Sequence, residues 1–105
     1  MAQLTEWLPA GSVVMLEDGE RPIMVAGFMI EDAVSGRYWD YVGYPYPEGC
    51  READTDYFFD RSMIESVLLV GYLDTTGQAF RDYLASTEES FENMRKSTSK
   101  KEKGA

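Results

Sequence analysis

The stretch SVVMLEDGERPIMVAGFMI, residues 12–30, decides the fold. Both of its halves are apolar and contain β-branched residues, which favours extended strands. Asp18-Gly19 lies between them and is typical of a two-residue hairpin turn, in which both central residues need a positive φ. Pro22 has no amide proton to donate, so it suits the start of the returning strand, and Gly27 predicts a bulge or bend within that strand. Residues 12–30 are therefore predicted to form a hairpin with a bent second strand.

Further segments extend this hairpin into a sheet. Residues 37–44 follow a turn at Ser35-Gly36 and predict a third strand. A long irregular segment, residues 45–56, leads to a short extended piece at 57–59. Residues 67–72 are apolar at both alternating positions, so we expect a strand that is buried on both faces.

The end of the chain predicts an amphipathic helix over residues 78–95. Thr75, followed three residues later by Gln78, offers a capping box before it. One stripe of the helix has helical spacing and consists of Phe80, Tyr83, Leu84, Thr87, Phe91 and Met94. We expect the first part of this stripe to dock on the sheet, and Phe91 and Met94 to overhang it. The predicted fold is α+β: a small, bent antiparallel β-sheet of about four or five strands, open or barrel-like, with a C-terminal amphipathic helix.

The charge divides the chain into two parts. The 105 residues carry a net charge of −9. Residues 1–94 hold 18 acids and five arginines but no lysine, a net charge of −13, whereas residues 95–105 have a net charge of +4. We therefore expect a single domain over 1–94. The basic tail, 95–105, has no apolar residue larger than alanine and is expected to be disordered, as a solubilising end or as an arm for an acidic partner.

Composition excludes several classes of function. The chain has no histidine, so it offers neither a Ser-His-Asp triad nor an imidazole metal ligand. A single cysteine cannot form an internal disulfide. Its glycines form no phosphate-binding loop, and a domain at −13 repels nucleic acid. We therefore expect no catalytic residue, no cofactor and no nucleic-acid partner.

A metal site and a membrane association are also not expected. Four acids have the spacing of a calcium-binding loop, but Phe58 and Phe59 occupy positions that need an oxygen ligand and a glycine; these acids are Asp54, Asp56, Asp60 and Glu65. The first residues lack the basic and apolar regions of a secretory signal, and no apolar run is long enough to span a membrane. The expected location is the cytoplasm.

Aromatic residues supply the best candidate binding surface. Tyrosine and tryptophan are favoured at protein interfaces, because they combine apolar area with a polar group. Such residues cluster in the third strand and the loop after it, where part of them must instead cover the sheet. An overhanging helix end would suit a partner helix or a homodimer. The predicted partner-binding residues are Tyr44, Tyr46, Glu48, Phe91 and Met94.

Several motifs resemble a widespread family of short Firmicutes proteins that is catalogued as a domain of unknown function. The most specific is Tyr41-x-Gly43 followed by Tyr46-Pro47-Glu48-Gly49; the opening LPAGSVV of residues 8–14 supports it. Genes of this family commonly lie beside type VII secretion systems and the LXG-type toxins that these systems export. The resemblance implies a cytoplasmic accessory protein without enzymatic activity, which acts as a chaperone or adaptor for a cognate toxin. It implies no set of functional residues.

The sequence is also compatible with two other functions. An acidic protein could act as an immunity protein that occludes the active site of the toxin. A small hydrolase could use two carboxylates that converge in a pocket, where the pKa of one of them is raised.

Overall fold

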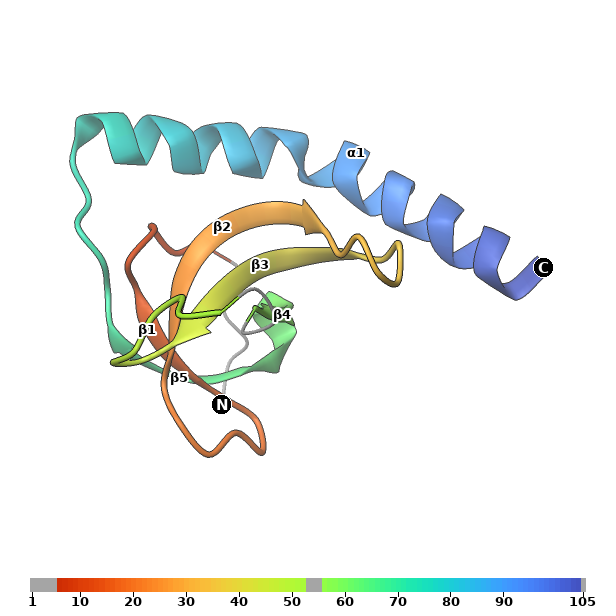
Figure 1. Ribbon diagram of the computed structural model, residues 1–105. Helices are drawn as coiled ribbons and strands as arrows, with labels where there is room; N and C mark the ends of the chain where they lie inside the picture. The colour runs from red at the N-terminus through yellow and green to blue at the C-terminus, as the bar shows by residue number, and fades with distance from the viewer. Residues whose placement is uncertain (1–5, 53–55, 105) are drawn as a thin grey trace.

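The computed structural model describes residues 6–52 and 56–104, with side chains described as far as residue 96. They form a five-stranded antiparallel sheet with the strand order β4-β3-β2-β1-β5 and one long helix. A short 3-10 turn, η1, links β4 to β5. The elements are β1 (Val13–Leu16), β2 (Ile23–Glu31), β3 (Tyr38–Pro45), β4 (Tyr57–Phe59), η1 (Arg61–Met63), β5 (Ile64–Leu69) and α1 (Thr75–Gly104). The predicted α+β class is confirmed (Figure 1).

The predicted hairpin is present, but its turn is longer than two residues. Strands β1 and β2 pair through Val13 with Met24 and Val14 with Ile23. On its other edge β1 pairs with β5 over its whole length, from Val13 with Leu69 to Leu16 with Ile64. The pairing with β2 stops early, and residues 17–22 form a loop in which Asp18 alone has a positive φ, of 61°.

The sheet curls because β2 is bent near its middle. The register between β2 and β3 shifts between Val25 and Gly27, as the bulge prediction required. A Cβ atom at Gly27 would lie 2.8 Å from Cγ1 of Val42, so a side chain here would push the two strands apart. The bend turns β2 around the core (Figure 1), but the sheet does not close: β4 and β5 remain its two edges.

The core lies between the curled sheet and the helix. The N-terminal segment enters it: the ring of Trp7 makes edge contacts with Tyr41, at 5.4 Å between centroids, and with Phe28, at 6.4 Å. The Tyr41 hydroxyl accepts a hydrogen bond from the Leu8 amide at 2.9 Å. The buried cluster comprises Trp7, Leu8, Val14, Ile23, Val25, Tyr41, Phe59 and Leu84.

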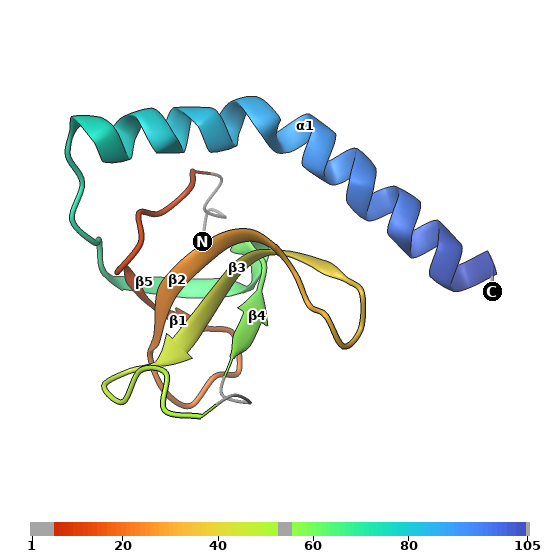
Figure 2. The same ribbon diagram turned by 45° about the horizontal axis from the view of Figure 1, so that its top comes forward.

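Helix α1 begins three residues earlier than predicted. Its cap is Asp74, because the Asp74 Oδ1 atom accepts the Gly77 amide at 2.8 Å; Thr75 is already the first helical residue. The helix crosses over β2 and β3, and its last turns project past the strands (Figures 1 and 2). Its backbone is helical to Gly104. The side chains from residue 97 onward lie outside those described, and a disordered tail over 95–105 stays a prediction.

The helix depends on Leu84 for its apolar contact with the core, where this residue is 2% exposed. We predict that Leu84→Ala lowers the free energy of unfolding by about 3 kcal/mol, because the substitution leaves a cavity between helix and sheet. Leu68→Ala, at an exposed position of β5, is the matched control and should change stability by less than about 0.5 kcal/mol. Urea unfolding of both variants measures the difference, and equal effects would contradict this description of the core.

Candidate functional site

A buried carboxylate joins the sheet to the helix. Asp40 on β3 is 4% exposed. Its Oδ2 atom accepts the backbone amide of Arg61 at 2.9 Å and the Arg61 Nε at 3.3 Å. Its Oδ1 atom accepts Nη1 of Arg95, from α1, at 3.2 Å. Asp40 therefore holds one arginine from each side of the interface.

Two more acids complete this arrangement. The Asp60 carboxylate accepts Nη2 of Arg95 at 2.8 Å and the amide of Asp40 at 3.0 Å. Oε1 of Glu88 accepts Nη1 of Arg61 at 2.6 Å and Nε1 of Trp7 at 2.5 Å. We call these five charged residues the clamp: Asp40, Asp60, Arg61, Glu88 and Arg95. Each of its carboxylates is bound by arginine, so the clamp ties α1 to the sheet and to η1.

Burial makes the ionised form of Asp40 unfavourable in free energy. Burial raises the pKa of Asp40 above its ordinary value of 3.8, although Arg61 and Arg95 oppose the rise. A buried ion pair often regains less free energy than the removal of its charges from water costs. The clamp therefore fixes the position of α1 at some expense of stability near neutral pH.

The predicted loop residues lie together at the end of the β2–β3 pair. Tyr46 is exposed, and its backbone oxygen accepts Nη2 of Arg21 at 2.9 Å. The same arginine forms an ion pair with Glu48. Tyr44 is half-buried, and the negative charge of the neighbouring Asp56 raises the pKa of its hydroxyl. Tyr46 and Glu48 thus contact the same arginine, whereas Tyr44 lies beside Asp56.

The structure changes the predicted roles of Phe91 and Tyr83 along α1, whereas Leu84 is buried as expected. Phe91 does not overhang the sheet: it is 4% exposed and packs edge-on against Tyr38, at 6.2 Å between ring centroids. The reason is the bend of β2 and β3, which carries the start of β3 under the middle of the helix. Met94 is exposed, as expected. Tyr83, expected to dock, instead lies exposed and stacks on Phe80, which touches Phe28 at 5.4 Å.

An exposed apolar segment was not predicted. Residues 67–72 were expected to be buried on both faces, yet Leu68, Leu69 and Val70 are each more than half exposed and Tyr72 is 83% exposed. The cause is the strand order, which places β5 at the edge of the sheet. The segment continues through residues 70–74 into the first turns of α1 (Figure 1). We call the exposed apolar residues of this region the apolar strip: Leu68, Leu69, Val70, Tyr72, Leu73, Phe80 and Tyr83.

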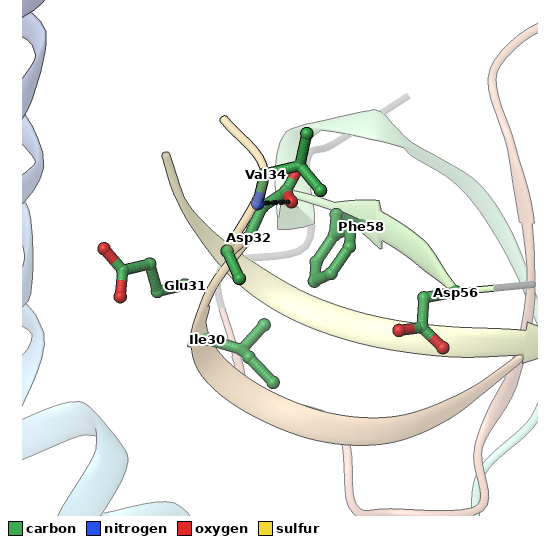
Figure 3. A pocket seen from close by; sticks show the side chains of 7 residues that line it. Ile30, Glu31, Asp32, Val34, Asp56 and Phe58 are labelled. Carbon is green, nitrogen blue, oxygen red and sulfur yellow. Dashed lines mark hydrogen bonds between the residues drawn. The ribbon is translucent and has the colours of Figure 1, made fainter. Parts of the chain in front are cut away.

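A cavity of about 350 Å³ lies at the tip of the β2–β3 hairpin. Figure 3 shows Phe58 between the carboxylates of Asp32 and Asp56, with Ile30 below. Asp32 serves the turn itself: its Oδ1 atom accepts the Val34 amide at 3.0 Å, and its Oδ2 atom accepts the Ser35 hydroxyl at 3.1 Å. The cavity therefore mixes acidic and apolar groups without pairing its carboxylates for acid–base chemistry.

The described residues contain neither a group placed to bind a metal ion nor a helix able to span a membrane. Between residues 6 and 104, except for 53–55, no group of three or more acid, cysteine or histidine side chains is placed to hold a metal ion. Asp54, part of the calcium-like spacing, lies outside the described residues. In the same part of the chain, no helix combines the length and apolar character that crossing a bilayer requires.

A comparison with known families matches the part of the chain that contains the whole sheet. A family model described as Domain of unknown function (DUF4176) matches residues 7–80. The chain belongs to this family. The match includes all five strands and the strip as far as Phe80, whereas Glu88, Phe91 and Arg95 lie beyond it. No curated protein and no solved structure matches the chain.

The clamp gives stability a defined dependence on pH. Between pH 3.8 and the raised pKa of Asp40, the folded protein holds a proton that the unfolded chain releases, so the contribution of Asp40 to stability falls as pH rises through this window. Asp40→Asn cannot ionise and lacks this slope. We predict that the free energy of unfolding of the wild type, relative to this variant, is largest below pH 3.8 and decreases towards neutral pH.

Urea unfolding at a series of pH values measures this difference. Glu89→Gln, which removes an exposed carboxyl group of α1, controls for the general loss of a charge. A stability advantage of the wild type that grows with pH would show that the arginines, not burial, dominate at Asp40.

Proposed function

We propose that this protein is a non-enzymatic accessory protein of type VII secretion, which binds its cognate LXG-type toxin in the cytoplasm before export. The apolar strip is the observation that carries this proposal. Leu68, Leu69 and Val70 are successive exposed apolar residues, and exposed apolar patches often mark sites of protein–protein interaction. A protein that holds an unexported client needs such a surface, because the client exposes apolar groups of its own.

The clamp supports a binding role over a catalytic one. In the clamp, the carboxylates of Asp40, Asp60 and Glu88 form ion pairs with two arginines. These carboxylates are therefore engaged at the interface between the sheet and α1. Their ion pairs hold the helix on the sheet and thereby present Phe80 and Tyr83 at its start. We infer that these acids stabilise the arrangement of a binding surface.

The charge of the domain supports a basic partner. Residues 1–94 carry −13. An acidic surface accelerates association with a basic protein and disfavours wrong partners of its own sign. Toxin domains that act on nucleic acids or nucleotides are often basic, so the charge is suited to such a client. The exposed Tyr46 beside Glu48 offers a second contact, on the loop that the sequence motifs single out.

The test is capture of the toxin encoded beside this gene. Co-expression followed by affinity purification of the tagged protein should recover the toxin, and deletion of this gene should lower the toxin level in cells. We predict that Tyr72→Ala combined with Tyr83→Ala weakens the complex by about tenfold or more, because two exposed aromatic anchors are lost. Val34→Ala, at a 97% exposed apolar residue of the hairpin tip, is the matched control and should bind normally.

Two results would decide against this role. Absence of a complex, together with an unchanged toxin level in the deletion strain, would reject it. If the captured toxin is inactive and cells that lack this protein die from incoming toxin, the protein is instead an immunity protein, the function that its acidic surface would also serve.

A further inference from the structure

We propose that β5 binds its partner by strand addition, taking up an extended basic segment along its free edge. This inference rests on the proposed binding function and names the part of the client that is recognised. The occupant is one strand of a partner protein whose apolar residues alternate with lysine or arginine.

The position of β5 supplies the backbone groups for this pairing. It is the last strand in the order β4-β3-β2-β1-β5 and pairs with β1 alone. Over the described ranges, no other strand pairs with its outer edge. An edge of this kind presents unpaired amide and carbonyl groups, which are a template for another extended chain. A helix is a poorer occupant, because its own backbone groups already bond to one another.

The composition of β5 leaves this edge open. Natural edge strands are commonly protected by lysine or proline. Residues 64–73 contain neither. Leu68, Leu69 and Val70 are instead exposed at this point, so an incoming strand would bury apolar side chains as well as pair its backbone.

The charge around β5 indicates which charge the partner strand should carry. Residues 62–80 contain no lysine or arginine, whereas Glu65 lies on β5 just before the strip and Asp74 lies within the strip, after Leu73. Both side chains are exposed. A strand with basic residues would place opposite charges across from these carboxylates, which stabilises cross-strand pairs.

The same charges argue against a second copy of this chain. Two copies paired through β5 would bring identical acidic segments together, and each copy has a net charge of −9. Like charges that face each other across paired strands are destabilising. We therefore assign the edge to a basic partner strand.

Binding of synthetic peptides to the full chain tests this assignment. The probe is a peptide of about seven residues, a usual strand length, in which lysine alternates with valine. A matched peptide carries an N-methyl group on every residue and so keeps side chains and charge but loses the backbone donors of both its edges. A third peptide replaces lysine by glutamate. Fluorescence anisotropy gives the affinities, and amide hydrogen exchange locates the site.

We expect the lysine–valine peptide to bind about tenfold or more tightly than either matched peptide, since several hydrogen bonds or the charge attraction are lost in those. Protection from hydrogen exchange should increase in β5. Leu68→Lys should weaken binding about tenfold, and Val34→Lys should leave it unchanged. Urea unfolding of both variants verifies that they remain folded.

Three results would overturn the proposal: equal affinity of the N-methylated peptide, protection confined to α1, or dimerisation of the free chain through β5 in sedimentation experiments. The toxin experiment separates this inference from the proposed function. If the toxin is captured normally by the Leu68→Lys variant, strand addition is wrong while the accessory role stands. If the peptide binds β5 but no toxin is captured, the edge is a binding site and the assigned client is wrong.

Discussion

The buried carboxylate of Asp40 is the constraint on which the rest of the structure depends. It lies where β3 passes beneath α1 and is bound by Arg61 from η1 and Arg95 from the helix. Apolar contact alone would leave a long helix free to slide or rotate on a small curved sheet, whereas paired charges accept one arrangement. The apolar contacts of Leu84 and Phe91 then follow from this register. Specificity of position, rather than net stability, is what such a buried network contributes here.

The sequence allowed the local elements to be predicted where one pattern dominated. The hairpin of residues 12–30 and the amphipathic helix were both expected, because strand propensity and helical spacing are patterns among residues that lie close together in the sequence. Asp18-Gly19 does not form a two-residue turn, because β1 and β2 already part after Val14 and before Ile23, while β1 continues to Leu16 with β5 on its other edge. The preference of two residues therefore does not determine where the pairing of two strands ends.

The surfaces were harder to predict than the elements. When a strand is apolar at every position, its sequence does not show whether it lies at the centre of a sheet or at its edge. The exposure of β5 therefore depends on the strand order, which the periodicity does not encode. The clamp is equally hidden, since Asp40 and Arg95 are 55 positions apart and nothing distinguishes them from the other charged residues. For Phe91, the spacing showed the correct face of the helix, but only the curvature of the sheet determines how far along the helix that face stays covered.

The extent of the family match has a consequence for how this domain is divided. Residues 7–80 contain every strand, and with them Asp40 and Arg61. The partners that complete the clamp from the helix, Glu88 and Arg95, lie outside that span. A fragment cut at the family boundary would keep the buried acid and lose half of its counter-charge, together with the Leu84 side chain that closes the core. The contacts that bury the core thus extend beyond the residues that define the family, into the turns of α1 that carry Leu84, Glu88 and Arg95.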